Sequence, residues 1–149
     1  MDRAVYIQTA WSAQDMALLK AEFALYNHRA VVRFACDCAE RACQRFTADN
    51  RAYAAILAGR GWADGLTSVP GVRAAAFAAH EAAREAMVPA AQAACRSAGH
   101  AAATAHVITH AAAAADYAAK AAPDPLQERE WQYNHLLSML QNMPDGFAR

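Results

Sequence analysis

The stretch that decides the fold reads AAAFAAHEAAREAMVPAAQAACRSAGHAAATAHVITHAAAAADYAAKAA, from Ala74 to Ala122. Roughly every second residue in it is alanine, the strongest helix former. Between Met87 and Ala115 the only formally charged side chain is Arg96. Because so few charges need water, we expect this stretch to be helix buried inside a helical protein.

The rest of the chain extends this interpretation to an all-α fold. A length of 149 residues suits one core. We predict a single alanine-rich domain of six or seven helices over residues 1–149, with residues 1–11 and 144–149 loosely ordered. A central long or kinked helix is expected at about 90–122. It is either one helix or two joined near Gly99, because glycine is a poor helix former but also lets another backbone approach closely.

Local start and stop signals place the other helices. The apolar period and capping residues predict helices at about 12–26 and 30–46, a third after Asp49, a fourth from Pro70 to Met87, and a last one after Pro125. Gly65 is expected to end the third helix. The helix at 30–46 separates a charged arc from an apolar arc, which predicts a surface helix that packs one side.

Charge and cysteine usage limit the class of protein. The chain carries 14 basic and 14 acidic residues, whereas proteins that bind nucleic acid or membrane surfaces electrostatically normally have a basic excess. No apolar run suits a signal peptide or a membrane span. The cysteines lack paired C-x-x-C spacing, which favours small buried thiols. We therefore expect a cytoplasmic protein with neither a nucleic-acid nor a membrane partner. The cysteines are Cys36, Cys38, Cys43 and Cys95.

Polar side chains that interrupt the alanine stretch are the candidates for a site. On helical wheels, Arg73, Phe77, His80 and Arg84 share one stripe of the fourth helix, and His106, His110 and Tyr117 share a stripe of the 90–122 segment. His100 and Thr104 fall on a different stripe of that segment. If the two histidine-bearing stripes face each other, they form a polar cleft with an arginine at its edge.

Three kinds of chemistry fit such a cleft. The histidines could be hydrogen-bonded within a polar core, could contact a ligand or partner, or could hold a metal such as zinc through His80, His106 and His110. The sequence His80-Glu81-Ala82-Ala83-Arg84 departs from the H-E-x-x-H zinc signature at its second ligand, where arginine cannot coordinate. We therefore expect no metal and no other cofactor.

Several segments together resemble the immunity-protein-five-like family, an all-helical family of bacterial polymorphic toxin systems. They are Asp49-Asn50-Arg51, Trp62-Ala63-Asp64-Gly65, the run from Arg73 to Glu85, the run from Gly99 to His110, Tyr117 to Ala121, and Glu128 to Gln132. The resemblance covers roughly residues 30–137. The chain departs from the family at Ala52, where the family often has proline.

The resemblance implies a small cytoplasmic protein that binds and neutralises a cognate toxin domain. The binding positions that it carries over to this chain are Trp62, Arg73, His80, Arg84, His100, Thr104, His106, His110 and Tyr117. No nucleophile elbow or glycine-rich phosphate loop is present, which favours a non-enzymatic binder.

The toxin contact is expected at the mixed-charge face of Arg33, Asp37, Arg41 and Arg45, or at the rim around Arg73 and Arg84. The alternative is a small-molecule or metal-binding protein, or an enzyme, that uses a cleft of His80, His106, His110, Arg84 and Tyr117.

Overall fold

The structure is a computed structural model that describes residues 28–141, and these form six α-helices and no strand. The all-α prediction is therefore confirmed for this part of the chain. The helix expected at about 12–26 and the ends expected to be loosely ordered lie outside the described residues. None of the described helices is long and apolar enough to cross a membrane. The helices are α3 (His28–Phe46), α4 (Asn50–Ala63), α5 (Val69–Glu85), α6 (Pro89–Ala103), α7 (His110–Ala121) and α8 (Pro125–Gln141).

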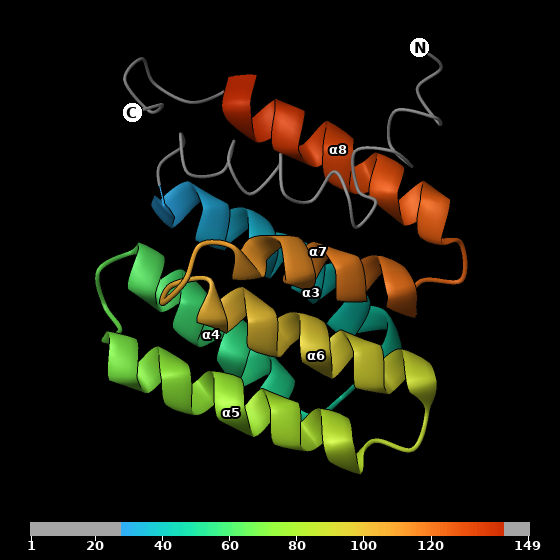
Figure 1. Ribbon diagram of the computed structural model, residues 1–149, viewed down its shortest axis with the longest axis horizontal. Helices are drawn as coiled ribbons and strands as arrows, with labels where there is room; N and C mark the ends of the chain where they lie inside the picture. Colours follow the sequence, from blue (N-terminus) through green and yellow to red (C-terminus); the bar gives the residue numbers. More distant parts are fainter. Residues whose placement is uncertain (1–27, 142–149) are drawn as a thin grey trace.

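The helices form a bundle in which consecutive helices are neighbours (Figure 1). Helices α3, α4, α6 and α7 pack together in the centre. Helix α5 packs on one edge against α4 and α6, and α8 packs on the opposite edge against α7 and α3 (Figure 1). This arrangement places α5, α6 and α7 side by side in order, so polar residues on these three helices can meet.

Alanine dominates the core, as the composition predicts. The buried faces of α6 and α7 consist almost entirely of alanine, and larger side chains such as Phe34, Ile56 and Val72 fill the remaining space. Because an alanine side chain is a single methyl group, the helices can approach closely, and packing density is reached through backbone proximity. The alanine stretch is thus a packing device.

The segment 90–122 is two helices, and the junction differs from the expected one. Helix α6 runs through Gly99, and the chain leaves the helix only between Thr104 and Thr109 before α7 begins at His110. Neither alternative offered by the sequence is formed: the segment is not one continuous helix, and its two helices do not join near Gly99. β-Branched residues crowd this turn and weaken its helix propensity. The Thr104 hydroxyl also donates to the His100 carbonyl at 2.9 Å, which competes with helix continuation.

The local capping signals are confirmed. The Asp49 carboxylate accepts from the Arg51 backbone N–H at 2.9 Å and caps α4. Gly65 follows that helix with φ of 78°, the left-handed conformation that glycine adopts without a Cβ penalty. Pro70 lies in the first turn of α5, where the Ser68 side chain caps the helix. These short-range features fix where α4 and α5 begin.

The sequence predicts that the charged arc of α3 faces solvent, but its side chains are only partly exposed, because most of them pair with other helices. Asp37 pairs with Arg60 of α4 at 2.8 Å, and Arg33 pairs with Asp64 at 2.8 Å. Glu40 joins Arg60 at 2.6 Å. Helix α3 therefore packs on both of its faces, and its charged arc is largely used by partners within the chain.

Helix α8 is anchored through polar side chains. Glu128, only 5 % exposed, accepts from Arg41 Nε and Nη2 of α3 at 2.8 and 3.0 Å. Gln132 is fully buried, and its amide donates to the Ala115 carbonyl of α7 at 2.8 Å. The Arg41 guanidinium also lies 4.0 Å from the centre of the Trp131 ring. These contacts hold α8 on the seam between α3 and α7.

Candidate functional site

Three histidines from three helices meet on one side of the bundle. His80 comes from α5, His100 from α6 and His110 from α7, and Arg96 and Tyr117 complete the group. We call these five residues the histidine cluster. All five are half-buried, so they are partly removed from water without being sealed in the core.

His80 is held by an arginine. Arg96 Nη1 lies 2.8 Å from His80 Nδ1. Arginine can only donate, so His80 Nδ1 must accept, which requires the neutral imidazole with its proton on Nε2. Burial lowers the pKa of His80, and the positive charges of Arg96 and Arg84 lower it further. The hydrogen bond and the electrostatic environment thus favour the same neutral form.

His100 lies at the centre of the cluster. Its Nδ1 is 2.9 Å from His110 Nδ1, so one ring donates and the other accepts. The ring stacks on Tyr117 at 5.4 Å with an interplanar angle of 8° and meets the edge of His80 at 5.0 Å. Burial, followed by the neighbouring His80, His110 and Arg96, lowers the pKa of His100 to about 4. His100 is therefore neutral at physiological pH.

Gly99 makes room for the His80 ring. A Cβ at this position would lie 2.6 Å from His80 Nε2 and 2.7 Å from His80 Cε1, well inside van der Waals contact. The glycine that looked like a helix breaker in the sequence therefore serves close packing, because it lets the imidazole rest on the α6 backbone.

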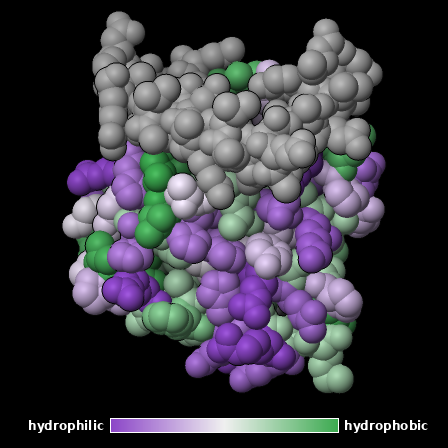
Figure 2. All heavy atoms as spheres, viewed as in Figure 1, coloured by the Kyte–Doolittle hydropathy of each residue, from purple (hydrophilic) through white to green (hydrophobic). Residues whose placement is uncertain are grey.

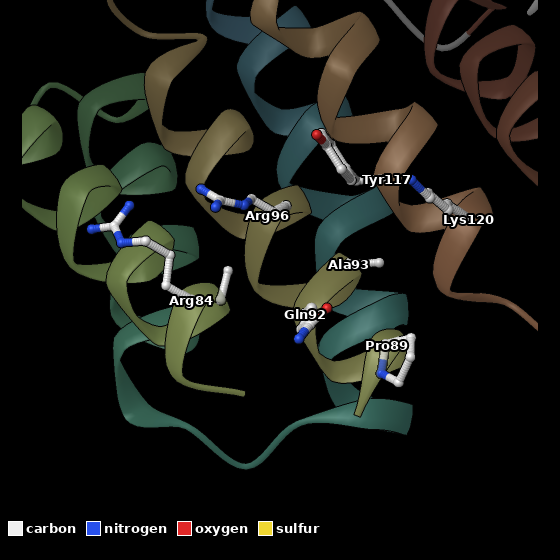
Figure 3. Close-up of a pocket in the computed structure, with 8 residues that line it drawn as sticks. Arg84, Pro89, Gln92, Ala93, Arg96, Tyr117 and Lys120 are labelled. Carbon is white, nitrogen blue, oxygen red and sulfur yellow. The ribbon is translucent and has the colours of Figure 1, made fainter. Parts of the chain in front are cut away.

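A cavity of about 440 Å³ opens beside the cluster and between the same three helices. Figure 3 shows that Arg84 comes from α5, Gln92 and Arg96 from α6, and Tyr117 and Lys120 from α7. Arg96 and Tyr117 belong to both the cluster and the cavity. Three of the lining residues are cationic and none is acidic. The lining residues are Ala83, Arg84, Pro89, Gln92, Ala93, Arg96, Tyr117 and Lys120.

The structure brings together three of the five residues predicted to form the cleft, with His100 and Arg96 beside them and Arg84 at the neighbouring cavity. His80, His110 and Tyr117 meet, but His106 lies exposed in the turn between α6 and α7, and His100 takes its place. The helical wheel that placed His106 and His110 on one stripe assumed a continuous helix. The turn between α6 and α7 breaks that helix, so the two residues do not share a face. The metal set of His80, His106 and His110 is therefore not formed. Within residues 28–141, no three His, Cys, Asp or Glu side chains are grouped to hold a metal ion.

The other residues carried over from the family resemblance lie apart. Trp62 packs against His28, with ring centres 4.9 Å apart. Thr104 is buried, its hydroxyl donates to the His100 carbonyl, and its own carbonyl lies 2.6 Å from His28 Nε2. Arg73 is exposed on α5 and Arg84 is exposed at the cavity.

Sequence reasoning missed two cationic residues of the cavity, Arg96 and Lys120. Arg96 was visible as the single charge between Met87 and Ala115, and a lone charge in an apolar helix needs a local partner or a ligand. Lys120 lies three residues after Tyr117, which puts both on one face of α7. Its ammonium is 5.8 Å from the centre of the Tyr117 ring.

The cysteines are buried free thiols, as predicted. Burial raises the pKa of Cys36 and of Cys43 to about 12, so neither forms a thiolate at neutral pH. Because the thiolate is the reactive species, these side chains act as packing groups.

The low pKa of His100 makes stability depend on pH. The unfolded chain takes up this proton near pH 6.5 and the folded chain only near pH 4. The contribution of neutral His100 is therefore complete above the unfolded pKa and is lost as pH falls toward the folded one. The full shift in pKa corresponds to about 3 kcal/mol, and because the ring is only half-buried, solvent screening should reduce the loss to on the order of 2 kcal/mol. The free energy of unfolding in urea across this pH range measures it.

Two variants test this assignment. His100→Gln should flatten the pH dependence relative to wild type, whereas His106→Gln, which changes an exposed imidazole, should leave it unchanged. An identical pH dependence in wild type and His100→Gln would contradict the assignment.

Comparison of the chain with known protein families finds a match. The family described as Imm-5 like putative immunity protein matches residues 21–139, which include helices α3 to α7 and nearly all of α8. No curated protein and no solved structure matches the chain. The match spans the histidine cluster, the cavity and most of the sequence. The chain therefore belongs to the family of Imm-5 like putative immunity proteins.

Proposed function

We propose that this protein is an immunity protein that binds the toxin domain of a bacterial polymorphic toxin and neutralises it without covalent chemistry. The observation that carries this proposal is the family match over residues 21–139. The buried, protonated thiols support the non-covalent part of the proposal, because they offer no ready nucleophile. We place the action in the cytoplasm, where free thiols stay reduced.

Of the two contact surfaces expected from the sequence, the structure favours the one on α5. On the mixed-charge face of α3, Arg33, Asp37 and Arg41 already pair with residues of the same chain. A toxin that used these side chains would have to break those ion pairs. That cost makes the α3 face a poor docking surface.

The exposed stripe of α5 has the properties of a docking surface. Phe77 is 65 % exposed, with Arg73 one turn before it and Arg84 two turns after it. Neither arginine forms an ion pair within the described residues, and Glu81 is the acidic residue on the same stripe. Exposed aromatic and arginine side chains are the types that dominate binding energy at interfaces. We call Arg73, Phe77 and Arg84 the α5 face, and we expect its partner surface to be acidic.

Growth rescue tests this proposal. The toxin domain that we expect to be encoded beside this gene is expressed in a host with wild-type protein, with Phe77→Asp, or with Leu126→Asp as control. Leu126 is an apolar residue of α8 that is 42 % exposed, on the opposite edge of the bundle. We expect wild type and Leu126→Asp to rescue growth. We expect Phe77→Asp to lose about 2 kcal/mol of binding energy and to rescue poorly, although it stays folded.

Two outcomes would contradict the proposal. A folded Phe77→Asp that rescues as well as wild type would remove the α5 face from the interface. Failure of the wild-type protein to rescue would overturn the function itself.

A further inference from the structure

We propose that the cavity between α5, α6 and α7 binds a phosphate group. This inference goes beyond toxin binding and does not depend on it. Its first support is the chemistry of the cavity walls. Arg84, Arg96 and Lys120 each come from a different helix, and no carboxylate lines the space (Figure 3). Figure 2 shows hydrophilic side chains gathered on this side of the molecule, over α5 and α6.

The three cations lack counterions within the described residues. Six other arginines form ion pairs with carboxylates: Arg33, Arg41, Arg45, Arg51, Arg60 and Arg129. Arg84, Arg96 and Lys120 do not. Glu85, next to Arg84 in the chain, pairs with Arg51, and Asp116, one turn before Lys120, pairs with Arg129. Three like charges around one cavity repel one another, so a bound anion would reduce this electrostatic repulsion.

Arg96 is held in position by His80. Its Nη1 donates to His80 Nδ1, and Gly99 leaves the space in which His80 rests. A guanidinium has five N–H donors, so those that His80 does not take are available to an anion. Tyr117 is likewise fixed by its stacking on His100. The neutral histidines thus serve as positioning residues for the polar groups of the cavity.

The size and charge of the site point to the class of ligand. Cations from three helices line this one cavity, and a phosphate, with two charges and several acceptor oxygens, matches that charge better than a carboxylate, which carries one charge and two oxygens. A volume of about 440 Å³ is in the range of small-molecule sites and leaves space beside the phosphate. The phosphate group could therefore be free phosphate or the phosphate of a monoester.

Calorimetric titration of the full chain alone tests the inference, with inorganic phosphate and ribose 5-phosphate as probes at constant ionic strength. We expect saturable binding that weakens at least about tenfold in Arg96→Gln and in Lys120→Gln. Lys120 is exposed, so its variant should fold even if Arg96→Gln does not. Arg73→Gln is the matched control, because it removes an exposed α5 arginine that does not line the cavity.

Each result has a defined meaning. Equal affinity for the two probes would identify free phosphate as a sufficient ligand, and tighter binding of ribose 5-phosphate would identify a monoester. Absence of saturable binding of both probes would overturn the inference. An equal loss in Arg73→Gln and Lys120→Gln would overturn it as well, because it would show binding to surface charge in general. No toxin takes part, so these outcomes are independent of the growth-rescue test.

Discussion

Replacing Glu128 by alanine is expected to lower the free energy of unfolding by about 3 kcal/mol, the largest effect of any single change considered for this protein. The Glu128 carboxylate is 5 % exposed and accepts hydrogen bonds from both Nε and Nη2 of Arg41. Its removal leaves the Arg41 guanidinium without its partner, and that side chain is only 37 % exposed. Removing one partner of a partly buried ion pair costs more stability than the intact pair contributes, because the remaining charge is left without its hydrogen bonds.

Urea unfolding followed by circular dichroism measures this effect. Asp64→Ala is the matched control, because Asp64 and Arg33 are 55 % and 43 % exposed and their ion pair should contribute less than about 1 kcal/mol. Similar losses in the two variants would show that the Arg41–Glu128 pair does not anchor α8.

Gly99→Ala should be the second most destabilising change, at about 2 kcal/mol, although alanine is normally the better helix former by about 1 kcal/mol. The added Cβ would meet three atoms of the His80 ring at less than 3.0 Å. The ring would have to leave its place between Arg96 and His100. Gly71→Ala, in the first turn of α5, is the control, because its Cβ would meet only ordinary contacts at 3.4 Å.

A double-mutant cycle isolates the cause of this effect. In a His80→Ala background the ring is absent, so Gly99→Ala should become neutral or stabilising, and the coupling energy between the two sites should be large. If Gly99→Ala costs the same with and without the His80 ring, the close packing of His80 on α6 does not explain the glycine.

The parts of the fold that depend on neighbouring residues in the chain could be predicted from the sequence. Asp49, Pro70 and Gly65 act within one helical turn, so their effects on the ends of α4 and α5 are independent of the rest of the molecule. Alanine content predicts helix for the same reason, because helix propensity is a local property.

The junction between α6 and α7 could not be predicted, because two local signals compete there. Gly99 is the poorer helix former, yet it stays in the helix because tertiary packing of His80 requires its missing side chain. The turn occurs instead among the β-branched residues between Thr104 and Thr109. Because the junction lies later in the chain than the sequence suggests, the histidine cluster contains His100 and not His106.

Ion pairs between residues far apart in the sequence were the other feature that could not be predicted. Asp37 and Arg41 look like residues of a solvated helix face, and their partners lie in α4 and α8. The same limit applied to the cavity, since Arg84, Arg96 and Lys120 become one cationic site only when three helices assemble. Helix periodicity gives the face of each residue on its own helix, but it does not give the neighbouring helix.

The most direct test of the central claim is a binding measurement with purified components. The chain is mixed with the partner that we propose, a toxin domain expected to be encoded beside its gene, in a variant that no longer inhibits growth. The mixture is separated by size-exclusion chromatography, and the intact mass of each component is measured by mass spectrometry. We predict a complex that forms with wild type and Leu126→Asp, weakens with Phe77→Asp, and leaves both masses unchanged. A toxin domain that elutes alone in the presence of excess wild-type protein, or that gains or loses mass, would contradict neutralisation by non-covalent binding.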